Sequence, residues 1–289
     1  MNKADFKAWC ATGLTRTTKT PEDMPLVMGV LNVTPDSFYD GGRYSNIDVA
    51  YDHAQTMIAA GADILDLGGE SSRPGAKPIS VQEELDRVMP ILERLLAADP
   101  IALSVDTCKP QVMIEAIKLG AACINDIGAL RAEGALEAVA SSDIPVCLMH
   151  MQSNPQTMQD APHYQDVVEE VDDFFAQHIQ RCVDAGVSRS RLILDPGFGF
   201  GKTVQHNLTV VNRLAQFQHH GLPIMLGVSR KSTIGTLLDQ PPSGRLAGGL
   251  ALATYAMLVG VSIMRTHDVL ETKQAFKIIQ EMHKTTVNP

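Results

Sequence analysis

Eight short apolar runs, each ending in or beside a polar residue, recur along the sequence and alternate with stretches of helical length. Each run is too short for a helix and lacks strict polar alternation, which is typical of strands buried on both faces. The runs cover residues 26–32, 64–67, 102–106, 123–126, 146–150, 192–195, 224–228 and 262–265. This alternation predicts a mostly parallel sheet covered by helices.

The intervening stretches have helical periodicity. Residues 81–98 carry six apolar side chains at helical spacing, and we also expect helices over 110–119, 166–185, 204–219 and 270–284. Glycines at 61, 120, 186 and 221 fall just after predicted helices, where a left-handed C-terminal cap is common.

Polar side chains at the strand ends distinguish a closed sheet from an open one. They are Asn32, Asp106, Asn125, Asp195 and Arg265. The outer strands of an open eight-stranded sheet would lie ~34 Å apart, too far for one small ligand to touch both. A closed barrel gathers all strand ends around one mouth. We therefore predict a (β/α)₈ TIM barrel, a single domain over residues 25–289, with an N-terminal extension over 1–24 at the barrel bottom.

Composition limits which partners and which cellular compartment the protein can have. The net charge of −9 argues against nucleic acid as a partner, and five cysteines without a CxxC pair predict free thiols in a reducing cytoplasm. The N-terminus has no apolar signal region. Residues 246–264 carry no charge, but their glycines and short length favour a buried helix and strand over a membrane span. We expect a cytoplasmic protein that contacts no membrane.

Three loops carry candidate functional residues. Residues 29–42 combine turn formers with Asp36 and Phe38, which suggests a lid, although an ordinary loop stays possible. Residues 68–76 offer the Ser72 hydroxyl and the Arg73 fork to an anion. Residues 195–203 match neither the P-loop nor the dinucleotide pattern, which leaves a carboxylate, Asp195, before a glycine- and aromatic-rich loop.

Two sets of side chains, one cationic and one of hydrogen-bond acceptors, are expected at the mouth of the barrel. Lys231, Arg265 and His267 follow the seventh and eighth strands, where barrels often bind phosphate. Asp106, Asn125 and Asp195 offer acceptors to a heterocycle rich in N–H donors. The alternatives are solvated cations and helix N-caps.

Seven motifs occur in a fixed order: MGVLNVTPDSFYDGG, GADILDLGGESSRPGA, SVDT, INDI, LDPGFGFGK, GVSRKS and RTHDV. Through them the sequence resembles the dihydropteroate synthase family of the bacterial folate pathway, over residues 26 to about 282. The resemblance implies a TIM barrel and a homodimer. It also implies condensation of 6-hydroxymethyl-7,8-dihydropterin diphosphate with 4-aminobenzoate to give 7,8-dihydropteroate and diphosphate, with sulfonamides competing for the aminobenzoate site.

The resemblance also implies residue roles. The pterin side comprises Asp106, Asn125, Met149, Asp195, Gly227 and Lys231. The aminobenzoate side comprises Ser72, Pro74, Phe200 and Ser229. Diphosphate contacts are expected from Asn32, Arg73, Arg265 and His267. Asn32 is the expected contact of a Mg²⁺ cofactor, and Asp36 and Phe38 belong to a loop that closes over the reacting centre. Lys231, Arg73, Arg265 and His267 also count among the expected catalytic residues.

The reacting methylene, flanked by an electron-rich ring, favours a dissociative displacement without a covalent enzyme intermediate. Three other functions stay open. A pterin-dependent methyltransferase acting on a corrinoid protein would share the pterin residues but not the aminobenzoate pocket. A Schiff-base aldolase would use Lys231. A non-catalytic pterin-binding module would not need the cationic set.

Overall fold

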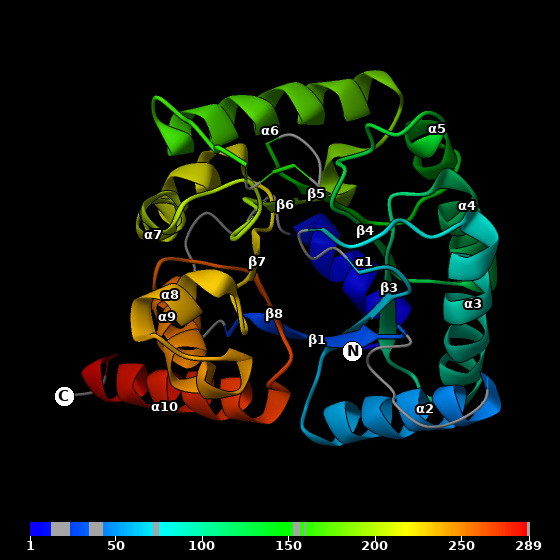
Figure 1. Ribbon diagram of the computed structural model, residues 1–289, viewed down its shortest axis with the longest axis horizontal. Coiled ribbons are helices and arrows are strands. Elements are labelled where there is room, and N and C mark those ends of the chain that lie inside the picture. Colours follow the sequence, from blue (N-terminus) through cyan, green and yellow to red (C-terminus); the bar gives the residue numbers. More distant parts are fainter. Residues whose placement is uncertain (13–23, 35–42, 72–74, 153–156, 159, 288–289) are drawn as a thin grey trace.

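The computed structural model describes residues 1–12, 24–34, 43–71, 75–152, 157–158 and 160–287 (Figure 1). Its strands agree with the predicted runs to within one or two residues at either end. They are β1 (Leu26–Asn32), β2 (Ile64–Gly68), β3 (Ala102–Asp106), β4 (Cys123–Asp126), β5 (Val146–Met149), β6 (Leu192–Asp195), β7 (Met225–Gly227) and β8 (Ile263–Thr266).

The sheet is a closed ring of parallel strands. Its order is β6-β5-β4-β3-β2-β1-β8-β7, and an isolated parallel bridge between Leu194 and Ile224 joins the two ends. Helices surround the ring (Figure 1). The predicted (β/α)₈ barrel is confirmed, and the open sheet was the wrong alternative.

The helices are α1 (Lys3–Thr12), α2 (Arg43–Ala59), α3 (Val81–Ala98), α4 (Pro110–Leu119), α5 (Ala135–Ala140), α6 (Val167–Asp184), α7 (Val204–Asn212), α8 (Ser232–Leu238), α9 (Leu246–Leu258) and α10 (Val269–Val287). Short 3-10 helices η3 (Arg189–Arg191), η4 (Leu214–His220) and η5 (Pro242–Gly244) join some of them. Sequence and structure agree at α3, whose N-cap Ser80 accepts a hydrogen bond from the Glu83 amide. The single helix predicted over 204–219 was wrong, because the chain tightens into η4 after Arg213.

The hydrophobic core forms two layers. The larger lies between the outer sheet face and the helices. The smaller fills the barrel bottom, where Phe6 and Cys10 of α1 pack on residues that begin the strands, such as Met28, Ile64 and Ile263. Helix α1 therefore covers this end of the barrel with an apolar face.

Two expectations from composition can be compared with the fold. All five cysteines are free, and four are buried. The uncharged segment 246–264 forms α9 and the start of β8, and no described helix is long and apolar enough to cross a membrane.

Strand register places the polar strand ends side by side. Asn32 pairs with Gly68, Gly68 with Asp106, and Asp106 with Asn125. Met149 pairs with Asp195, and Gly227 with Arg265. Polar groups distant in sequence therefore gather toward the carboxyl end of the barrel.

Candidate active site

A cavity of about 340 Å³ opens at the carboxyl ends of the strands. It is lined by all six residues expected to hold a pterin, together with Arg265 and Phe200: Asp106, Asn125, Met149, Asp195, Gly227 and Lys231. Ile127, Gly197 and Phe198 complete the wall. Acceptors and cations thus face one small space.

An ion-pair network forms one side of this cavity. The Arg265 guanidinium donates through Nε to Asp66 at 2.6 Å and through Nη2 to Asp106 at 2.9 Å. The Asn125 amide also donates to Asp66, at 2.9 Å. Asp66 is fully buried, and its second oxygen has no hydrogen-bond partner among the described residues. In the sequence Asp66 lies within an apolar strand run, and it was not among the predicted site residues.

Burial shifts the pKa values of the charged groups around the cavity. It raises the pKa of Asp106 to about 7, against the attraction of Arg265, and it raises the pKa of Asp195. Burial opposes the charge of Arg265 too, but Asp66 and Asp106 outweigh it and raise the pKa of that guanidinium. Burial, assisted by Arg265, lowers the pKa of Lys231 to about 8. Shifted carboxylates and lysines in one cleft are typical of active sites.

The aromatic wall comes from the loop after β6. Phe200 is 8% exposed, and the Lys231 ammonium lies 4.0 Å from the centre of its ring, within cation–π range. This packing orients both residues toward the cavity.

His267 and Ser229 lie beside the cavity rather than on its wall. Ser229 Oγ donates to Asp268 at 3.1 Å, so His267 Nδ1, at 3.1 Å, acts as a donor to the same hydroxyl. Burial, with help from Arg265, lowers the pKa of His267 to about 4. His267 is therefore neutral at pH 7 in this state, and its Nε2 carries a lone pair until an anion raises its pKa.

Asn32 ends β1 and pairs with Gly68 at the end of the neighbouring strand β2. Its amide oxygen is 3.4 Å, and an Asp106 carboxylate oxygen 3.8 Å, from the point that a Cβ on Gly68 would occupy. Glycine at position 68 therefore keeps the space between these groups open. One Asp106 oxygen already binds Arg265, and the amide oxygen of Asn32 is a second group here that suits a hard cation.

Five predicted site residues lie outside the described residues: Asp36, Phe38, Ser72, Arg73 and Pro74. The base of the second loop is described. Lys109 bridges Glu70 and the buried Glu84, at 2.6 Å and 2.5 Å, and Glu70 also accepts from the Ile79 amide at 2.8 Å.

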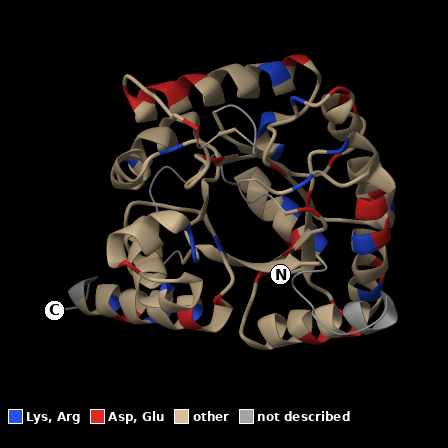
Figure 2. Ribbon diagram, viewed as in Figure 1, with Lys and Arg blue, Asp and Glu red and all other residues tan. Residues whose placement is uncertain are grey.

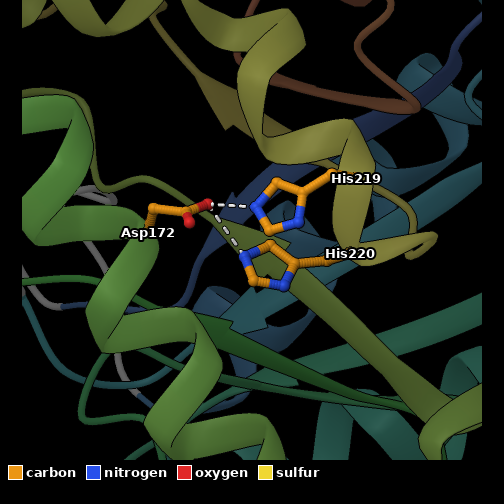
Figure 3. A group of neighbouring side chains, drawn as sticks. All are labelled: Asp172, His219 and His220. Carbon is orange, nitrogen blue, oxygen red and sulfur yellow. Dashed lines mark hydrogen bonds and ion pairs between the residues drawn. The ribbon is translucent and has the colours of Figure 1, made fainter.

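A group of potential metal ligands lies elsewhere, between α6 and η4. Asp172 accepts from Nε2 of His219 at 2.7 Å and of His220 at 2.9 Å (Figure 3). The three side chains satisfy one another by hydrogen bonding, which accounts for their arrangement without an ion. Lys and Arg are scattered among Asp and Glu around the ring of helices (Figure 2), so in this view no basic face stands out.

The chain matches the family model described as pterin binding enzyme over residues 28–267. It is 53% identical to dihydropteroate synthase of Escherichia coli strain K12 over 256 residues, 89% of this chain and 91% of that protein.

Three solved structures share the fold. The Yersinia pestis dihydropteroate synthase in complex with a sulfonamide drug has a TM-score of 0.87 and 49% identity, covering 93% of this chain and 98% of that one. The Xanthomonas albilineans enzyme with 4-aminobenzoic acid has a TM-score of 0.85 and 46% identity, and with 7,8-dihydropteroate 0.80 and 41%; both cover 90% of this chain and 94% of the other.

Proposed function

This chain belongs to the pterin binding enzyme family, among the dihydropteroate synthases, and from that membership we propose that it condenses 6-hydroxymethyl-7,8-dihydropterin diphosphate with 4-aminobenzoate. The family resemblance drawn from the seven motifs is confirmed. The observation that carries the proposal is the cavity in which Asp106, Asn125 and Asp195 face Arg265 and Lys231. The methyltransferase alternative is not favoured, because the relatives compared here are synthases.

The three acceptors suit the pterin ring. Asp195 and Asn125 are 5% and 3% exposed, so hydrogen bonds from ring N–H groups form in a water-poor environment, where they are strong. As diphosphate leaves the methylene carbon, positive charge spreads into the ring. The carboxylates of Asp106 and Asp195 then stabilise a cation-like transition state, which is the differential stabilisation that accelerates a dissociative step.

Arg265 stands between the ring and its anionic tail. Its guanidinium is held by Asp66 and Asp106, so it needs little reorganisation to receive the departing diphosphate. His267 adds a second donor once the anion raises its pKa and Nε2 takes up a proton. The arylamine nitrogen attacks the carbon from which diphosphate has departed, forms the new C–N bond and then loses one proton to solvent or to the diphosphate. Lid closure by the loop holding Asp36 and Phe38 would exclude competing water.

The direct test is diphosphate release. The purified protein, given the pterin diphosphate and Mg²⁺, should release diphosphate and form dihydropteroate only when 4-aminobenzoate is present. Release that ignores 4-aminobenzoate, with no dihydropteroate formed, would contradict the proposal. A sulfonamide should compete with 4-aminobenzoate and not with the pterin.

A magnesium ion is part of the proposed chemistry. It would be held by the Asn32 amide oxygen together with diphosphate oxygens and water, a shell that Mg²⁺ favours. When bound, it neutralises diphosphate charge and makes that group easier to displace. A ligand set that depends largely on the diphosphate oxygens fits an ion that arrives with the substrate.

Replacing Asn32 by leucine should lower kcat about tenfold or more while leaving pterin affinity within threefold, because the amide is not a ring contact. Turnover and the Mg²⁺ concentration at half-maximal rate would be measured by diphosphate release, and affinity by calorimetry. Asn32→Asp should need less Mg²⁺ than Asn32→Leu. Equal losses of turnover and pterin affinity would instead indicate that Asn32 contacts the pterin ring.

Lys231 gives the site a pH dependence. Its ammonium, with a pKa lowered to about 8, is expected to help hold the pterin diphosphate. The charged form exists below that pKa, so kcat/KM should fall about tenfold per pH unit as pH rises beyond it. A Lys231→Arg variant stays charged, so its alkaline limb should move to higher pH. If the alkaline limb of the pH profile does not move in Lys231→Arg, a group other than Lys231 titrates there.

We also propose a homodimer in the cytoplasm. Eight of the large exposed apolar side chains lie on α8, α9 and α10: Leu237, Leu238, Leu246, Tyr255, Leu258, Leu270, Ile278 and Met282. Such a patch on adjacent helices is typical of a subunit interface. The free buried thiols suit a reducing compartment.

Sedimentation equilibrium should give twice the chain mass of 31.3 kDa. Leu258→Lys combined with Ile278→Glu should halve it, because charges would be buried at the interface. A matched change on α4, Ile114→Glu, should leave the mass unchanged. A wild-type monomer at micromolar concentration would refute the dimer.

A further inference from the structure

The loop after β6, residues 196–202, ends in Lys202, a lysine that is only 3% exposed. Among the described residues its ammonium donates three hydrogen bonds: to His150 Nδ1 at 2.8 Å, to the Gly197 carbonyl at 3.2 Å and to the Phe200 carbonyl at 3.1 Å. An ammonium has three N–H donors, so each donor has an acceptor. A long charged side chain seldom occupies such a buried position without a structural or functional reason.

These bonds join separate parts of the site. His150 follows β5, whereas Gly197 and Phe200 lie near the two ends of the loop after β6. One nitrogen atom therefore holds the loop closed on itself and fixes it to the neighbouring strand end.

The loop has little stiffness of its own. Gly197, Gly199 and Gly201 all have positive φ, in a region that most residues avoid. A Cβ on Gly197 would lie 1.9 Å from the His150 carbonyl oxygen, so this backbone rests directly on the end of β5. Because glycine residues make the backbone flexible, hydrogen bonds to side chains must fix the conformation of this loop.

Other buried side chains complete the restraint. Asp195 accepts from the Gly197 amide, Asn207 accepts from the Gly199 amide, and the Tyr164 hydroxyl donates to the Gly201 carbonyl, each at 2.7 Å. Lys202 differs from these because one of its bonds goes to Phe200 itself. The ring of Phe200 in turn lines the cavity and packs beneath the Lys231 ammonium.

We propose that Lys202 is a positioning residue for the second substrate: its buried ammonium fixes the 196–202 loop so that Phe200 forms the wall against which 4-aminobenzoate binds. Lys202 acts through Phe200 and is not expected to touch either substrate. The proposal rests on the proposed function, since it assigns the Phe200 side of the cavity to 4-aminobenzoate.

The electrostatics add a pH signature. Burial lowers the pKa of Lys202 to about 7, with Lys231 lowering it further and Asp195 opposing the shift. Burial lowers the pKa of His150 to about 2, so that ring is neutral and accepts. Tyr164 also faces the ammonium, with its ring centre 6.0 Å from Nζ. A neutral amine has two N–H groups, so above neutral pH one of the three acceptors loses its bond.

The test compares wild type with Lys202→Met, whose unbranched side chain is one atom shorter and has no hydrogen-bond donors. We expect the KM for 4-aminobenzoate to rise at least tenfold while kcat falls less than threefold. The dissociation constant for 6-hydroxymethylpterin, from calorimetry, should stay within threefold. The control is Lys118→Met, an exposed lysine on α4 that should behave as wild type. Raising the pH from 6 to 8 should weaken 4-aminobenzoate binding more in wild type than in Lys202→Met, in which Lys231 still titrates.

A double-mutant cycle shows whether Lys202 acts through Phe200. Phe200→Leu alone should raise the KM for 4-aminobenzoate, and adding Lys202→Met to it should change that KM by less than twofold. If Lys202→Met does not fold, Tyr164→Phe removes one bond from the same loop and should raise the same KM about threefold.

The outcomes separate this inference from the proposed function. An unchanged KM in Lys202→Met, additive effects in the cycle, or an equal loss of pterin affinity would overturn it. If wild type makes no dihydropteroate, the proposed function fails, and hydrogen exchange still tests the loop. Amides of residues 197–201 should then exchange at least tenfold faster in Lys202→Met, and unchanged exchange would exclude any positioning by Lys202.

Discussion

Replacing Arg265 by methionine is expected to lower kcat/KM by about 10²- to 10³-fold and to destabilise the fold by about 3–5 kcal/mol. We expect the loss of activity because the proposed mechanism makes Arg265 the main donor to the departing diphosphate. The loss of stability follows because the carboxyl groups of Asp66, fully buried, and Asp106 would lose the guanidinium that pairs with both. Diphosphate release and urea unfolding, followed by circular dichroism, would measure the two effects.

A double variant separates them. Adding Asp66→Asn to Arg265→Met removes one of these carboxyl groups, so part of the stability should return while activity stays low. If Arg265→Met unfolds at the same urea concentration as wild type, the network does not stabilise the barrel in the way its burial implies.

Asp195→Asn is expected to weaken pterin binding by about 10²- to 10³-fold. Asp195 uses one oxygen to accept from the Gly197 amide at 2.7 Å and has a second for the ring. An asparagine amide offers one oxygen only. In either orientation its NH₂ group opposes a donor, the loop amide or the ring N–H, and the negative charge that favours a cation-like ring is gone.

Calorimetry with 6-hydroxymethylpterin measures this loss directly. Asp172→Asn, a change of the same kind between α6 and η4, is the matched control and should bind normally. Affinity within threefold of wild type in Asp195→Asn would remove Asp195 from the ring contacts.

The polar strand ends were predictable because each follows a short apolar run and stands at the carboxyl end of that run. Apolar runs locate the strands to within one or two residues, and parallel pairing then forces Asp106, Asn125 and Asp195 to one rim. The helix over 81–98 was equally accessible, since its apolar spacing and its length both indicate a helix and the structure has α3 over the same residues.

The residues that position the site side chains could not be predicted from local sequence patterns. Asp66 interrupts an apolar run, and that single acidic residue was the available signal; its partner Arg265 lies 199 positions away. Lys202 reads as a solvated lysine because its acceptors are mostly backbone carbonyls, which every residue has. Contacts of this kind depend on tertiary placement that no local pattern encodes.

Helix α1 closes the end of the barrel remote from the chemistry, with Phe6 fully buried and stacked on Trp9 at 5.9 Å. Natural variation in this segment should therefore alter how many copies of the enzyme escape proteolysis in a cell, and hardly alter how fast each copy works. A strain with a damaged α1 would resemble one with a weak promoter, and raising expression would restore its growth.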